Sequence, residues 1–224
     1  MARIARFVAP GLPHHITQRG NRREPVFFSD EDYQAYLDLL REHAGRSGCA
    51  IWAWCLMPNH VHIIAVPRTG DGLRALVAEV HRRYAARINA RNKWTGHLWQ
   101  GRFSSVAMDD RHACEAIRYV SLNPVRAGLV ARAEDWPWSS TRTLLSGRKD
   151  GLVDVKAVLK RTGDFAAFLA QEPDAESIDA LRHSETIGRP LGSANWIERL
   201  EARYARRLSP QKRGPKKAGV EAGN

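Results

Sequence analysis

The feature that most constrains the fold is a pair of short apolar segments separated by two turn-forming residues. Residues 49–57 read CAIWAWCLM and residues 60–67 read HVHIIAVP, with Pro58 and Asn59 between them. Both segments are rich in aromatic and β-branched residues, which is typical of buried strands. A proline–asparagine pair favours a tight turn. We therefore expect two strands that are consecutive in the chain, the second of them covered on both faces.

The segments around this pair alternate between strand and helix. The expected elements are a strand within 11–21, helices over 29–48 and 70–92, a strand near 103–108, and a helix over 109–123 that Pro124 ends. Together with the central pair they give the order β-α-β-β-α-β, which matches the ferredoxin-like pattern. The predicted fold class is α+β, a ferredoxin-like or RRM-like core with an antiparallel sheet and helices on one face.

The chain changes character after about residue 135. Weaker helical signals run to about residue 207, and the last segment, from residue 209 on, is basic and lacks apolar residues. We expect three regions: a domain over 1–135, a helical C-terminal extension over 136–208 that contacts DNA or regulates the domain, and a disordered basic tail over 209–224.

The charge of the chain indicates the class of its partner. The formal net charge is +11 and the isoelectric point is about 10.1. Such an excess favours a polyanion, either a nucleic acid or, less often, an anionic membrane surface. No apolar run approaches the ~20 residues of a membrane span and no signal peptide is recognisable, so we expect a cytoplasmic protein. Cys49, Cys55 and Cys114 are odd in number and widely spaced, which argues against disulfides and a zinc site.

His60 and His62 are candidate metal ligands. Residues two apart on a strand share a face, so both imidazoles point the same way, in line with Ile64 and Val66. Two imidazoles in apolar surroundings are costly to bury unless they are hydrogen-bonded or bind a metal. Residue spacing leaves both explanations open, because each histidine could instead be satisfied by a carbonyl or carboxylate.

Tyr119 and Asn123 form a second candidate pair. They are four residues apart, so on a helix they lie one turn apart on the same face. The amide oxygen of Asn123 could be a third ligand beside the two imidazoles, with the phenol of Tyr119 projecting alongside. The alternatives are that Tyr119 is a packing residue and that Asn123 caps a turn that begins with Pro124.

Several motifs, in order, resemble those of a known family. The segments MPNHVHIIA, GHLWQGRF and YVSLNPVRAGLV resemble the REP-associated tyrosine transposases, which belong to the single-tyrosine HUH transposases. HHITQRGNRREPVFFSDEDY and WPWSS extend the resemblance over about residues 10–140, and GRPLGSANWIERLE and QKRGPKK continue it more loosely.

The resemblance implies a function and assigns roles. The protein would be a metal-dependent single-stranded DNA endonuclease and strand transferase that acts on REP-type hairpin DNA through a 5′-phosphotyrosine intermediate. By motif, Tyr119 would be the nucleophile, and His60, His62 and Asn123 would bind Mg²⁺ or Mn²⁺. Related transposases often have glutamine at the third ligand position, and asparagine is shorter. The protein would act as a monomer or a homodimer and would be nucleoid-associated when bound to DNA.

Arginines supply the candidate DNA contacts. Three lie at helical spacings on the helix over 70–92 and three near the motifs: Arg82, Arg83, Arg87, Arg102, Arg118 and Arg126. An alternative for each is a solvated surface residue.

Two other functions compete with the transposase reading. One is a protein that binds REP DNA or RNA on the same fold without cutting it. The other is a metal-dependent phosphoesterase without a covalent step, but the chain has no second H-x-H.

Overall fold

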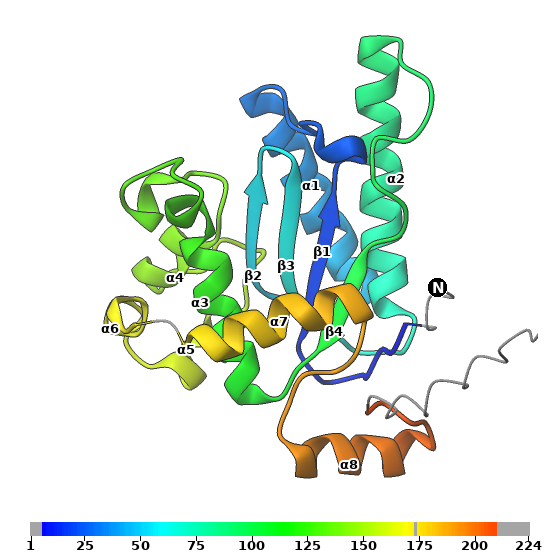
Figure 1. Cartoon of the computed structure of the whole chain (residues 1–224). Helices are drawn as coiled ribbons and strands as arrows, with labels where there is room; N and C mark the ends of the chain where they lie inside the picture. The colour runs from blue at the N-terminus through cyan, green and yellow to red at the C-terminus, as the bar shows by residue number, and fades with distance from the viewer. Residues whose placement is uncertain (1–5, 173, 210–224) are drawn as a thin grey trace, which may run out of the picture.

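The computed structural model describes residues 6–172 and 174–209, and it contains a four-stranded antiparallel sheet (Figure 1). The strands are β1 (His14–Arg19), β2 (Cys49–Met57), β3 (His60–Pro67) and β4 (Ser104–Ala107), in the order β2-β3-β1-β4. β2 and β3 pair with each other across the predicted turn. The central position of β3 explains why its sequence is apolar on both faces.

Pairing between the strands aligns the polar positions of the sheet. In the pairing of β1 with β3, Thr17 is opposite His62 and Arg19 is opposite His60. Residues directly opposite each other in an antiparallel pair project to the same face, so these four side chains share one face. The β2–β3 register shifts between Ile51 and Ala53, which marks a bulge in β2.

One face of the sheet is covered by α1 (Asp30–Ser47) and α2 (Gly72–Asn92). Acidic residues in the first turn and Gly48 in the left-handed conformation at the C-cap define the ends of α1. Aromatic side chains from α1 and α2, including the fully buried Tyr36 and Tyr84, fill the space beneath. The predicted ferredoxin-like core, with its two helices on one face, is confirmed.

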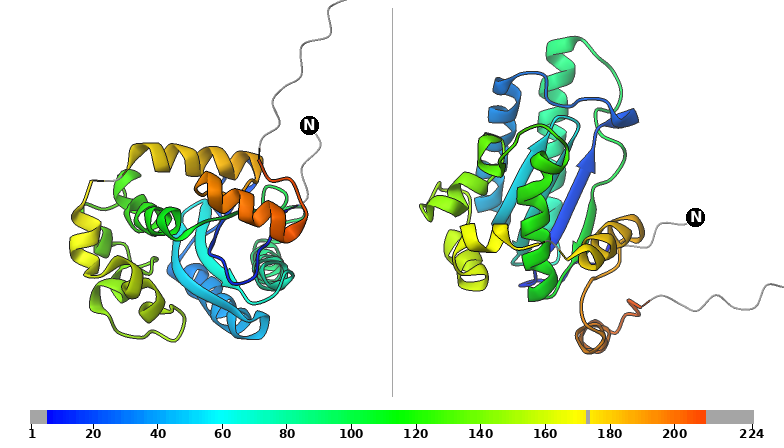
Figure 2. Two further views of the ribbon diagram at one scale, coloured as in Figure 1. Left: turned by 90° about the horizontal axis from the view of Figure 1, so that it is seen from below. Right: turned by 60° about the vertical axis from the view of Figure 1, so that its left-hand side comes forward.

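The opposite face is covered by α3 (Asp110–Arg126), so the sheet lies between two helical layers (Figure 2). The Asp109 side chain caps α3 by accepting a hydrogen bond from the backbone N–H of His112. The prediction that Pro124 ends this helix was wrong, because α3 continues to Arg126. Pro124 lies in the last turn of α3, and it lacks the N–H that would donate the i→i−4 hydrogen bond there.

The segment after α3 protects the edges of the sheet. After a 3₁₀ turn at Ala133–Asp135 its helices are α4 (Thr141–Ser146), α5 (Val155–Thr162), α6 (Phe165–Ala170), α7 (Ala175–Ile187) and α8 (Ala194–Tyr204). A second 3₁₀ turn, Asn21–Arg23, follows β1. Bridges from Ser139 and Val153 pair with β2, and Leu191 pairs with Met108 after β4. Covered edges cannot template pairing with another chain.

Helix α7 crosses in front of β4 on the same side of the sheet as α3 (Figures 1 and 2). Ser104 Oγ in β4 donates a hydrogen bond of 2.8 Å to the Glu185 carbonyl in α7. This placement brings the C-terminal extension next to the polar face of the sheet. The division into three regions stays a prediction, and all of the predicted basic tail except Ser209 lies outside the described residues.

The three cysteines are free thiols, as the sequence predicts. Among the described residues, no helix is both long enough and apolar enough to cross a membrane.

Candidate active site

His62 lies at the centre of the polar face and is only 4% exposed. Its Nδ1 atom lies 2.9 Å from Nε2 of His15 on the neighbouring strand β1. Its Nε2 atom is buried and has no hydrogen-bond partner. Burial, followed by the nearby His15 and His60, lowers the pKa of His62 well below its usual range, so this imidazole is neutral.

His60 lies two residues earlier on β3, and its ring centroid is 4.9 Å from that of His62. Its Nδ1–H donates a hydrogen bond of 2.7 Å to the side-chain oxygen of Asn59. Burial lowers the pKa of His60 to about 4, with Arg19 acting in the same direction and Glu185 opposing it. Both histidines therefore carry an uncharged ring at neutral pH, the form that binds metal ions.

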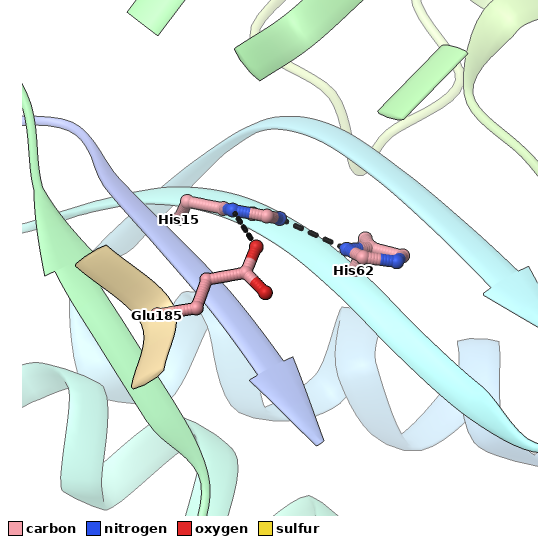
Figure 3. A group of neighbouring side chains, drawn as sticks. All are labelled: His15, His62 and Glu185. Atoms are coloured by element: carbon pink, nitrogen blue, oxygen red, sulfur yellow. Dashed lines mark hydrogen bonds and ion pairs between the residues drawn. The ribbon is translucent and has the colours of Figure 1, made fainter. Parts of the chain in front are cut away.

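His15 connects the pair to the C-terminal extension. It is fully buried, and its Nδ1 atom lies 3.0 Å from Glu185 Oε1, a carboxylate that α7 brings to the site. Figure 3 shows Glu185, His15 and His62 in a row, each joined to the next by one contact. Ligand atoms of these three residues lie within 4.8 Å of one another, close enough to hold an ion together.

Tyr119 projects from the middle of α3 towards the histidines. Its ring centroid lies 5.6 Å from that of His62 and 6.2 Å from that of His15, in an edge-to-face arrangement in both cases. The guanidinium carbons of Arg126 and Arg182 lie 5.0 and 5.7 Å from the centre of the phenol ring. Two cations beside the ring favour the approach of an anionic group to Tyr119.

The histidines and the tyrosine line a common cavity of about 330 Å³. Its polar and charged walls come from β1, β3, β4, α3, α7 and the loop before β4: Thr17, Gln18, Arg19, His60, His62, Gln100, Arg102, Ser104, Tyr119, Glu185 and Thr186. Two arginines, two imidazoles and a phenol that converge on one cavity suit the recognition of a phosphate group next to a nucleophile.

The structure therefore brings together three of the four residues assigned to catalysis and metal binding. Asn123 is one turn beyond Tyr119 on α3, and its Nδ2 atom is buried without a hydrogen-bond partner. It does not line the cavity as the described residues define it. Its role as a ligand stays a prediction.

Of the six predicted DNA-contacting arginines, two lie near the cavity, three are exposed on α2, and Arg118 is buried. Arg102 lines the cavity and Arg126 lies against Tyr119. Arg82, Arg83 and Arg87 are exposed on α2, on the opposite side of the sheet from the cavity.

Three of these arginines make hydrogen bonds within the protein. Arg82 and Arg83 both donate hydrogen bonds to Glu79. Arg118 is 4% exposed, and its guanidinium donates hydrogen bonds to Glu115 and to the backbone carbonyl of Phe168. These bonds give Arg118 a role inside the protein, between α3 and α6.

Sequence reasoning missed His15, Glu185 and Arg182. The signal for His15 was present, because it shares a face with Thr17 and Arg19 in the strand that the sequence predicts within 11–21. Glu185 and Arg182 lie more than 60 residues beyond Tyr119, on a helix with no motif of its own. Only the packing of α7 beside β4 could have revealed them.

Curated proteins are similar in sequence to part of this chain. It is 28% identical over 89 residues to the REP-associated tyrosine transposase of Escherichia coli K12, a match that covers 39% of this chain and 52% of the relative. A Haemophilus influenzae Rd protein provisionally given the same name is 26% identical over 99 residues, covering 39% of this chain and 56% of the relative. The chain thus spans about half the length of the curated relatives it matches.

A solved structure shares the fold. It is described as a REP-associated tyrosine transposase bound to a REP hairpin, and it aligns with a TM-score of 0.57 and 23% identity over 69% of this chain and 90% of the other. These matches confirm the resemblance that the motifs indicated. The family model for IS200-like transposases matches residues 9–123, just over half of the sequence, and it ends at Asn123. The chain belongs to the IS200-like transposase family.

Proposed function

We propose that this protein is a metal-dependent single-stranded DNA endonuclease and strand transferase that acts on REP-type hairpin DNA through a 5′-phosphotyrosine intermediate. The observation that carries the proposal is that Tyr119 on α3 and the His60–His62 pair on β3 line one cavity within a single chain. Membership of the transposase family supports the reaction class. Because one chain supplies all three side chains, a monomer is sufficient to build the site, and a homodimer is the alternative.

Tyr119 would attack the phosphorus of a phosphodiester in the cavity. The phenolic oxygen forms a bond to phosphorus as its proton leaves, the bond from phosphorus to the 3′-oxygen breaks, and that oxygen takes up a proton to become a 3′-hydroxyl. The 5′-phosphate is then held on Tyr119. Attack by the 3′-hydroxyl of another strand reverses the chemistry, so rejoining requires no nucleoside triphosphate.

The residues present fit a divalent cation. His62 Nε2 is a buried nitrogen without a partner, and the neutral rings of His60 and His62 meet the requirement for deprotonated ligands. His60, His62 and Asn123 are the proposed ligands of Mg²⁺ or Mn²⁺, and imidazole nitrogens favour Mn²⁺. When bound, such an ion would polarise the phosphoryl oxygens and stabilise the charge that develops on them.

The arginines nearest the cavity would hold the DNA strand. Arg19 and Arg102 line the cavity wall, and Arg126 and Arg182 flank the phenol, so phosphates on either side of the cleaved bond can be neutralised. We propose a REP hairpin as the partner because the solved relative is described as bound to one. A chromosomal partner fits the predicted cytoplasmic, nucleoid-associated location.

The proposal is tested with a labelled single-stranded REP hairpin, Mn²⁺ and denaturing electrophoresis. We expect a protein–DNA adduct that survives denaturation with the wild type and none with Tyr119→Phe, which keeps the ring but lacks the oxygen. If Tyr119→Phe still cleaves, Tyr119 is not the nucleophile. If both proteins bind the hairpin tightly and neither cleaves it, the alternative of a non-cleaving REP-binding protein on the same fold replaces the proposal.

A further inference from the structure

Both histidines of β3 use the same ring nitrogen to contact another side chain. His60 Nδ1 faces Asn59 and His62 Nδ1 faces His15. In a neutral imidazole one nitrogen carries a hydrogen and the other a lone pair, and the contacts of one nitrogen decide the state of the other. The partners of the two Nδ1 atoms therefore control whether each Nε2 can bind an ion.

For His60 the geometry settles the tautomer. Asn59 Nδ2 donates a hydrogen bond of 2.8 Å to the Arg23 carbonyl, so the other end of the amide, its oxygen, faces His60. An amide oxygen only accepts hydrogen bonds, and His60 Nδ1 must carry the hydrogen. His60 Nε2 is left with a lone pair. The turn residue directly before the H-x-H motif thus orients its first histidine.

For His62 the same result requires two residues in series. Glu185 Oε1 lies 3.0 Å from His15 Nδ1 without forming an aligned hydrogen bond, and the negative charge of the carboxylate beside this nitrogen favours a hydrogen there and, in a neutral ring, a lone pair on His15 Nε2. That lone pair accepts the hydrogen of His62 Nδ1, 2.9 Å away. The reverse arrangement would put a hydrogen on His62 Nε2, where a buried donor would have no acceptor.

We propose that Glu185 and His15 are positioning residues for His62, as Asn59 is for His60, so that both histidines present a bare Nε2 to one divalent ion. Figure 3 shows that the second ring nitrogen of His62 lies on the side away from His15. The identity of the ion rests on the function proposed above. Glu185 lies on α7, beyond the segment 9–123 that the family model matches, so the C-terminal extension completes the metal site of the family domain.

A competing role for Glu185 is direct ligation, because His15, His62 and Glu185 are close enough to share an ion. The two roles respond differently to Glu185→Gln. The amide oxygen of glutamine can face His15 Nδ1 as an acceptor, which preserves an orienting role. It is a poor replacement for a carboxylate ligand. Glu176, exposed near the start of the same helix, provides the matched control Glu176→Ala.

The first measurement is the tautomer of each histidine in the full-length, metal-free protein, read by long-range ¹H–¹⁵N correlation of the imidazoles. We expect His60 and His62 both to carry hydrogen on Nδ1. In Glu185→Ala and in His15→Phe, His62 is expected to lose this single tautomer while His60 keeps it. A His62 that carries hydrogen on Nε2 in the wild type would overturn the proposal.

The second measurement is Mn²⁺ affinity by titration calorimetry, at high salt so that the long-range attraction of the carboxylate is screened. We expect Glu185→Ala and His15→Phe to weaken Mn²⁺ binding by about 10- to 100-fold, the usual effect of removing a residue that orients a metal-binding histidine. Glu185→Gln should retain most of the affinity and Glu176→Ala all of it. An equal loss in Glu185→Gln and Glu185→Ala would identify Glu185 as a ligand and overturn the orienting role.

Neither measurement uses DNA cleavage. If no adduct forms on Tyr119 but the tautomers and Mn²⁺ affinities behave as expected, the proposed reaction fails and the orienting role stands. If the adduct forms but the Glu185 and His15 variants match the wild type in both measurements, only the orienting role fails.

Discussion

Each face of the sheet has a tyrosine close to a histidine, but the surroundings of the two pairs differ. Between α1 and α2, Tyr36 Oη lies 2.9 Å from His81 Nε2, and Tyr36 is fully buried. On the α3 side, Tyr119 lies across from His62, whose Nε2 atom has no partner. Residue type is the same in both places. The Tyr119–His62 pair differs in that it lines a cavity, has arginines beside it, and includes a buried nitrogen, His62 Nε2, without a hydrogen-bond partner.

Both pairs are buried, but only the Tyr119–His62 pair lines a cavity among the described residues. Burial raises the pKa of Tyr36 and lowers that of His81 to about 3, so both stay neutral within a closed core. Around Tyr119, the open cavity and the side chains of Arg126 and Arg182 can receive an anion. The α1/α2 pair is therefore part of the closed core, whereas the α3 face offers a cavity that can receive an anion, and we propose that the reaction takes place there.

The largest expected effect is on the histidines of the α3 face. His60→Ala or His62→Ala should abolish cleavage of the REP hairpin, because each removes a proposed ligand, while most of the DNA affinity stays with the arginines. Adduct formation and hairpin binding measured side by side check this. A loss of binding as large as the loss of cleavage would argue against a metal-binding role.

A smaller effect is expected from Tyr36→Phe on the other face. The change leaves His81 Nε2 buried without its partner, so the free energy of unfolding should fall by about 1–3 kcal/mol. Urea denaturation measures the loss. Cleavage per folded molecule should stay at the wild-type level. A loss of cleavage without a matching loss of stability would contradict the structural role of the α1/α2 face.

The smallest expected effect is on the arginines. Arg126→Ala should weaken hairpin binding and reduce the salt slope by about 0.7–0.9, the value for one phosphate contact. Binding measured over a series of salt concentrations gives the slope. Arg87→Ala, exposed on α2, is the comparison: an equal change there would mean that the DNA also runs over the α1/α2 face, as the arginine spacing alone suggested.

Local sequence patterns were sufficient for most of the fold. The apolar segments and the turn at Pro58–Asn59 predicted β2 and β3 with the bounds that the structure has. The helix end at Pro124 was misplaced, because α3 continues to Arg126 although Pro124 cannot donate an i→i−4 hydrogen bond.

The amino-acid sequence was enough to predict the β-α-β-β-α-β order, the shared face of His60 and His62, and the family to which the chain is similar. All three are encoded in short-range periodicity and in motifs. The packing of distant segments, by contrast, buries Arg118, places His15 against His62, and brings Glu185 on α7 to His15. Those contacts join residues that are 47 and 170 positions apart, and no local propensity specifies which distant helix packs beside a given strand.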